Sequence, residues 1–172
     1  MRRLVRMGNM DDRKYAENLG RLVNNMQELE MLLRATLFQD EIARGISKQT
    51  DKRLVQGEII PENAYTNWDT LGALIQKYNK LTISTGLTID ETLVDIRDAI
   101  AHGRVFAYTP TGISQLVRFY KPENNQVKVK FSVSMTDEWF GKAIGRFYDA
   151  IRRVDSVHKK QHGMPSDLTE PL

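Results

Sequence analysis

The stretch IRDAIAHGRVFAYT, residues 96–109, is where the pattern of this chain changes. Up to His102 the apolar residues recur every three or four positions, as they do on one face of a helix. From Val105 onward apolar and polar residues alternate, as they do in a strand. Gly103 stands at the junction, and we expect it to end the helix in a left-handed conformation. The chain should therefore be helical before this point and form strands after it.

Helical spacing recurs on both sides of this stretch, and each expected helix has a residue that can cap its first turn. We expect helices over residues 12–44, 68–81, 89–102 and 137–157. The expected caps are Asp11 or Asp12, Thr66 or Asn67, Thr88 with Glu91 as a capping box, and Thr136. Gly45 can stop the first helix, and Trp68 is expected on the apolar stripe of the second.

The alternating region contains three runs, VFAYT, SQLVRFYK and QVKVKFSVS, which are rich in β-branched and aromatic residues. The sequence PENN, residues 122–125, separates the last two runs and is typical of a turn. We therefore expect Leu116–Lys121 and Val127–Val133 to pair as an antiparallel hairpin. The whole β insertion should span residues 105–134.

Composition limits the architecture and the classes of site that the chain can hold. With 172 residues, 41% of them hydrophobic, the chain can bury one core, and we expect a single domain over residues 1–172. The expected fold class is mainly α, a helical bundle of about four helices with a small antiparallel β-hairpin inserted before the last helix. We expect both ends to be flexible, residues 1–10 and the polar tail over residues 159–172.

Several classes of function lack the residues that they need. The chain has no cysteine, which excludes disulfides, thiolate metal sites and a cysteine nucleophile. No apolar run is long enough for a membrane span, so we expect a cytoplasmic protein without a membrane partner. His158 and His162 have a spacing that could suit a metal, but no motif places a carboxylate beside them. We therefore expect neither a metal nor another cofactor.

Polar residues on the helix before Gly103 are the best candidates for a functional site. Arg97 falls on the flank of the apolar stripe, and His102 lies one turn after Asp98 on the polar side. Asp98 could accept a hydrogen bond from the His102 ring and favour its charged form, as could the negative end of the helix. The alternative is that His102 only interacts with the helix end and that Arg97 and Asp98 are ordinary surface groups.

The sequence RDAIAH, residues 97–102, resembles the R-x4-6-H motif of HEPN domains, with a polar residue after the arginine and a glycine after the histidine. As architecture, the resemblance extends over residues 11–157. It implies a metal-independent endoribonuclease whose composite site forms between the two subunits of a homodimer. In that site Arg97 would hold the scissile phosphate, His102 would serve as acid and base for attack by the 2′-OH, and Asp98 would position His102.

The resemblance also implies RNA as the partner and a role in toxicity, phage defence or RNA processing. Basic residues that could contact RNA are Arg104, Arg152 and Arg153, although a solvated basic helix face is the simpler interpretation of the last two. One branch of HEPN toxins has a tyrosine where this chain has Arg104, which argues against the nucleotidyltransferase antitoxin of that branch. A different protein antitoxin or regulator is still an expected partner.

Two alternatives from other functional classes stay open. The first is a non-catalytic helical module of the same fold that binds RNA or a protein and keeps the motif as an interface. The second is a helical transcription regulator, for which we find no helix-turn-helix spacing in the sequence.

Overall fold

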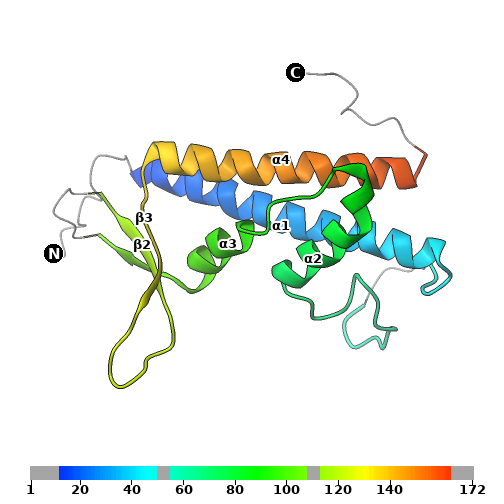
Figure 1. The fold of residues 1–172 in the computed structure, drawn as a ribbon, viewed down its shortest axis with the longest axis horizontal. Coiled ribbons are helices and arrows are strands. Elements are labelled where there is room, and N and C mark those ends of the chain that lie inside the picture. The colour runs from blue at the N-terminus through cyan, green and yellow to red at the C-terminus, as the bar shows by residue number, and fades with distance from the viewer. Residues whose placement is uncertain (1–11, 50–54, 108–112, 164–172) are drawn as a thin grey trace. The chain divides into compact units, whose positions relative to one another are not determined.

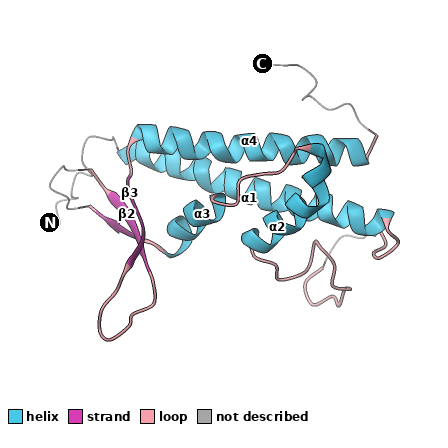
Figure 2. Ribbon diagram, in the orientation of Figure 1, coloured by secondary structure: helices cyan, strands magenta, loops and turns pink. Residues whose placement is uncertain are grey.

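The computed structural model describes residues 12–49, 55–107 and 113–163, and this part of the chain is mainly helical, as predicted. The helices are α1 (Asp12–Ala43), α2 (Leu71–Thr82), α3 (Leu93–His102) and α4 (Asp137–Gln161), with a short 3-10 helix at Ile83–Thr85. A small antiparallel sheet lies between α3 and α4 in the sequence (Figures 1 and 2). Among the described residues, no helix combines the length and apolar composition needed to cross a membrane.

The chain divides into two compact units. Of the described residues, the first contains 12–26, 92–107 and 113–148, and the second contains 27–49, 55–91 and 149–163. Helices α1 and α4 each contribute residues to both units. The candidate residues of the RDAIAH motif all belong to the first unit.

In the first unit, the beginnings of α1 and α4 run parallel to each other. Lys14 Nζ lies 2.5 Å from Asp137 Oδ2, and Asn25 Nδ2 donates to the carbonyl of Ile144 at 3.5 Å, so residue numbers rise together along the contact. Apolar side chains from both helices and from α3 are almost fully buried in this unit: Leu22, Leu93, Ile96, Phe140 and Phe147. The predicted cap of α4 is confirmed, because Thr136 Oγ1 accepts a hydrogen bond from the Trp139 amide at 3.1 Å.

The sheet of the first unit has the order β1 (Arg104–Phe106), β2 (Gln115–Phe119) and β3 (Val129–Ser134), with both pairs antiparallel. The predicted hairpin is therefore present, and the run after Gly103 adds a third strand that begins one residue before the predicted insertion. The PENN turn is also confirmed. Glu123 and Gln126 exchange two backbone hydrogen bonds of 2.9 Å, and Asn124 and Asn125 both have positive φ.

Gly103 ends α3 by a different means from the one predicted. Its φ is −77° and its ψ is 176°, so its backbone is extended rather than left-handed. Its amide donates to the Ala99 carbonyl at 2.7 Å, and a Cβ at this position would lie 2.2 Å from that carbonyl oxygen and 3.1 Å from the Val117 carbonyl. Glycine is therefore required because the backbone packs closely against α3 and β2, and not because of its φ.

In the second unit, the end of α1, helix α2 and the end of α4 all bury apolar side chains. Its buried side chains include Leu29, Leu33, Leu74, Ile75 and Tyr78. Burial raises the pKa of the Tyr78 hydroxyl to about 12, and this hydroxyl donates to the Leu87 carbonyl at 3.0 Å.

The predicted starts of α2 and α3 are wrong. Helix α2 begins at Leu71 after a Thr70 cap, and Trp68, predicted on the apolar stripe, is 98% exposed. Arg34 explains this, because its guanidinium binds the backbone carbonyls of Asn67 and Asp69 at 3.1 and 2.9 Å and holds this segment outside the helix.

Helix α3 begins at Leu93, so Thr88 and Glu91 do not form the predicted capping box. The Asn79 side chain occupies both backbone groups of Ile89, donating to its carbonyl at 2.9 Å and accepting from its amide at 2.8 Å. These bonds tie the residue to α2 and prevent an earlier helix start.

The end of α4 is longer than predicted, because residues 159–161 are helical rather than flexible. Lys159 pairs with Asp155 at 3.0 Å, one turn earlier, which supports this last part of the helix. His162 and Gly163 form a turn after the helix, and the remaining residues predicted to be flexible, 1–10 and 164–172, lie outside the described part of the chain.

We predict that Gly103→Ala destabilises the protein by about 1–3 kcal/mol, because the new Cβ would overlap the Ala99 carbonyl. Gly141→Ala is the matched control: Gly141 lies in α4 with open space around it, so this change should stabilise by about 0.5–1 kcal/mol. Urea unfolding followed by circular dichroism measures both. Equal effects of the two substitutions would contradict the close packing of Gly103.

Candidate functional site

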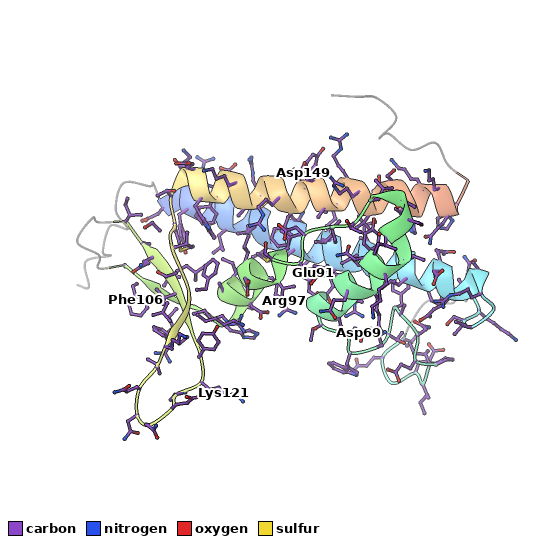
Figure 3. All side chains as sticks on the ribbon, viewed as in Figure 1. Asp69, Glu91, Arg97, Phe106, Lys121 and Asp149 are labelled. Carbon is purple, nitrogen blue, oxygen red and sulfur yellow. The ribbon has the colours of Figure 1, made fainter. Side chains whose placement is uncertain are left out.

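The candidate site is built on α3 and on the sheet strand beside it. Leu93, Ile96 and Ala99 form the buried side of α3. Arg97 and Asp98 lie next to this side and are only partly exposed, at 27% and 18% of their side-chain surface. Figure 3 shows Arg97 on α3, close to the strands. The helix thus presents one cation and one anion toward β2.

The Asp98 carboxylate lies between two guanidinium groups. Its Oδ1 accepts a hydrogen bond from Arg97 Nη1 at 2.8 Å, and its Oδ2 lies 2.7 Å from Arg118 Nη1 on β2. Arg118 Nη1 is buried, yet it makes no hydrogen bond of good geometry, so its contact with Asp98 is an ion pair rather than a directed bond. One carboxylate therefore joins α3 to β2 and balances one of two positive charges.

His102 is the last residue of α3, and it does not contact Asp98 as predicted. Its side chain is exposed and makes no hydrogen bond or ion pair with any described residue. The physical reason is that both oxygens of Asp98 are already engaged by guanidinium groups, which attract a carboxylate more strongly than a neutral imidazole does. His102 is therefore open to a ligand or to another protein chain.

Arg97 keeps donors that Asp98 does not use. A guanidinium has five N–H groups, and within the described residues only Nη1 has a partner, Asp98, so Nε and Nη2 remain for a second anion. Arginine binds phosphate oxygens through two parallel hydrogen bonds. Arg97 can therefore bind a phosphate while it still contacts Asp98.

Arg104, predicted as a phosphate contact, lies on the face of the sheet opposite Arg118. It pairs with Val117, which is adjacent to Arg118, and successive residues of a strand point to opposite faces. Its guanidinium lies 5.8 Å from the centre of the Phe119 ring, as in a cation–π contact. The structure thus groups Arg97, Asp98 and Arg118 and gives Arg104 different surroundings.

Arg152 and Arg153 belong to the second unit. Arg153 is exposed and donates to the Gly86 carbonyl at 3.5 Å, and Arg152 is partly exposed.

His158 and His162 contact each other near the end of α4, with ring centres 4.6 Å apart. Burial, followed by the nearby His162, lowers the pKa of His158, and Asp155 opposes this. No group of three or more histidine or acidic side chains suited to a metal occurs in the described part of the chain.

We predict that Asp98→Asn lowers the free energy of unfolding by about 1–2 kcal/mol, because an amide cannot balance the two guanidinium groups. Asp95→Asn, on the exposed side of the same helix, should change it by less than about 0.5 kcal/mol. A double-mutant cycle with Arg118→Gln should give a coupling of about 0.5 kcal/mol or more. Additive effects in that cycle would show that the ion pair does not stabilise the fold.

Sequence reasoning missed Arg118 as a member of the site, although the alternation of the strand sequence placed it on one face of β2.

Comparisons of the chain with models of protein families, with characterised proteins and with solved structures give no match.

Proposed function

We propose that this protein is a metal-independent endoribonuclease of the HEPN type, with a HEPN-like helical bundle, and that it cleaves RNA by attack of the 2′-OH. The observation that carries the proposal is the exposure of His102 at the end of α3, where its side chain makes no hydrogen bond or ion pair with a described residue. It is exposed and uses neither ring nitrogen within the described chain, while Arg97 on the same helix has donors to spare.

Arg97 binds the scissile phosphate in this proposal. Its charge is permanent, and its free N–H groups can follow the phosphate oxygens as negative charge develops on them. Asp98 does not orient His102; it holds Arg97 through the 2.8 Å hydrogen bond. Arg118 supplies the second positive charge that keeps this carboxylate in place.

His102 transfers the proton. Imidazole is the side chain that most often serves both as acid and as base in catalysis. As the 2′-oxygen forms its bond to phosphorus, imidazole accepts the proton of the 2′-OH. The bond from phosphorus to the 5′-oxygen breaks, and this oxygen receives a proton from imidazolium. The products are a 2′,3′-cyclic phosphate and a 5′-OH, and DNA is not cleaved because it lacks the 2′-OH.

A homodimer supplies a complete site. Arg97 and His102 are five residues apart, about 140° around an ideal helix, so one copy does not direct both side chains at one phosphate. Two copies of α3 facing each other can combine an arginine of one with a histidine of the other. We propose that such a dimer acts in the cytoplasm in toxicity, phage defence or RNA processing. A protein antitoxin or another protein partner would regulate it.

A non-catalytic module that binds RNA or a protein is the second candidate. The observation that favours it is the ion pairing of Arg97 and Arg118 by Asp98, which already gives these residues a structural role. The two candidates differ in the effect of removing His102, which only the enzyme needs for a chemical step.

We predict that His102→Ala lowers the rate of RNA cleavage about 100- to 10,000-fold, because it removes the group that transfers the proton. Arg97→Ala should lower it about 100- to 1,000-fold. The assay is cleavage of cellular RNA in EDTA, with analysis of product ends for cyclic phosphate. Matched controls are His162→Ala, in the turn after α4, and Arg21→Ala, on α1; both positions are exposed, and both variants should keep full activity.

The outcome that contradicts an enzyme is equal inactivity of the unmodified protein and the His102→Ala variant, with both folded and dimeric. Activity that disappears in EDTA would instead show a metal-dependent reaction and would contradict the proposed mechanism.

We predict that specific activity falls as the protein is diluted below the dissociation constant of its dimer, because half of a composite site has no activity. Sedimentation gives the dissociation constant, and initial rates are measured over concentrations on both sides of it. A specific activity that stays constant far below this concentration would show that one subunit holds a complete site.

A further inference from the structure

The hairpin of β2 and β3 extends beyond the sheet into an exposed, positively charged end. All residues from 121 to 130 are exposed, and Figure 3 shows Lys121 in this part of the hairpin. The segment contains Lys121, Lys128 and Lys130 against one carboxylate, that of Glu123. Since none of the three lysines pairs with a carboxylate in the described chain, their charges are available to an anion.

An aromatic ring lies among these charges. Tyr120 is 50% exposed, and its amide donates to the Lys128 carbonyl at 2.9 Å, which sets the two residues opposite each other. The ammonium groups of Lys128 and Lys130 lie 5.9 and 5.8 Å from the centre of the Tyr120 ring. These cation–π contacts hold the ring and both charges in one place.

The ring borders a depression at the end of the hairpin. This depression has a volume of about 590 Å³, and its lining includes Tyr120, Lys121, Val127 and Lys128, with Glu123 as its one acidic side chain. Such a volume is within the range of small-ligand sites. The tight turn at Asn124 and Asn125, both with positive φ, fixes its far side.

We propose that this hairpin-tip site, formed by Tyr120, Lys121, Lys128 and Lys130, binds an unpaired nucleotide of single-stranded RNA. The base stacks on the exposed ring of Tyr120, and the adjoining phosphates bind the lysines. The choice of RNA rests on the proposed ribonuclease function, for which this site would hold the substrate away from the bond that is cleaved.

The pairing of a ring with cations is what selects this ligand. Duplex RNA has its bases stacked on one another and offers phosphates alone, so it would not use the exposed ring. An acidic peptide would likewise need only the lysines. A single strand presents a base face and phosphates at neighbouring positions, which matches the aromatic and cationic groups of the hairpin.

The experiment measures binding of a fluorescent 2′-O-methyl oligouridylate to the full chain by anisotropy. This probe has no free 2′-OH and cannot be cleaved by the proposed reaction, so binding is tested independently of activity. Tyr120→Ala should raise the Kd about tenfold, and Tyr120→Phe, which keeps the ring, should leave it within about twofold.

The lysines are tested through salt dependence. Lys128→Gln with Lys130→Gln should reduce the slope of log affinity against log salt by about 1.4, since each phosphate contact on a single strand contributes about 0.7. The matched control, Lys14→Gln with Lys142→Gln, removes the same charge from lysines that already pair with carboxylates and should leave the slope unchanged.

Three results would overturn the hairpin-tip site. The first is a Kd that Tyr120→Ala does not change, and the second is duplex RNA that binds as tightly as the single strand. The third is displacement of the probe by polyglutamate to the same extent from the unmodified protein and from the Tyr120→Ala variant. Binding that depends on Tyr120 in a protein without ribonuclease activity would keep this site and contradict the enzyme. RNA cleavage that requires His102, together with probe binding that does not depend on Tyr120, would support the enzyme and contradict the hairpin-tip site.

Discussion

The close approach of three backbone segments at residue 103 is the constraint on which the first unit depends. The Gly103 amide closes the last turn of α3 on the Ala99 carbonyl, and the same residue touches β2. No side chain can stand between them, so β1 starts directly after the helix. The direction of the whole sheet relative to α3 follows from this contact.

The candidate site is a product of that junction. Because β2 is held against α3, Arg118 reaches Asp98 from a position twenty residues later in the chain, and Asp98 in turn holds Arg97. His102, one residue before the junction, is left outside this set of contacts. The arrangement combines an ion-paired arginine with an imidazole that makes no hydrogen bond or ion pair with a described side chain, and the proposed mechanism depends on these two groups.

Local sequence patterns predicted those parts of the structure that local interactions determine. Helical spacing predicted α1 to within one residue and the start of α4, and PENN predicted the hairpin turn. The starts of α2 and α3 could not be predicted, because Arg34 and Asn79 bind the backbone of segments far along the chain. No pattern of spacing shows such bonds.

The same limit applies to the site. The motif located Arg97 and His102 on the last turns of a helix, but the predicted contact between Asp98 and His102 is absent. The actual partner of Asp98 is on a strand, however, and its choice depends on how strand and helix pack. The position of Gly103 in the sequence identified it as the end of a helix. The need for glycine there is steric, and it can be seen only when the position of β2 is known.

The parallel contact between α1 and α4 bears on how the first unit folds. Helix α3 and the three strands form from a continuous segment of the chain, so their contacts close short loops. Lys14 and Asp137, by contrast, are separated by 123 positions. Closing so long a loop costs more chain entropy, and contacts of this kind slow folding. The helix and sheet should thus form an early template, onto which the beginning of α1 docks last.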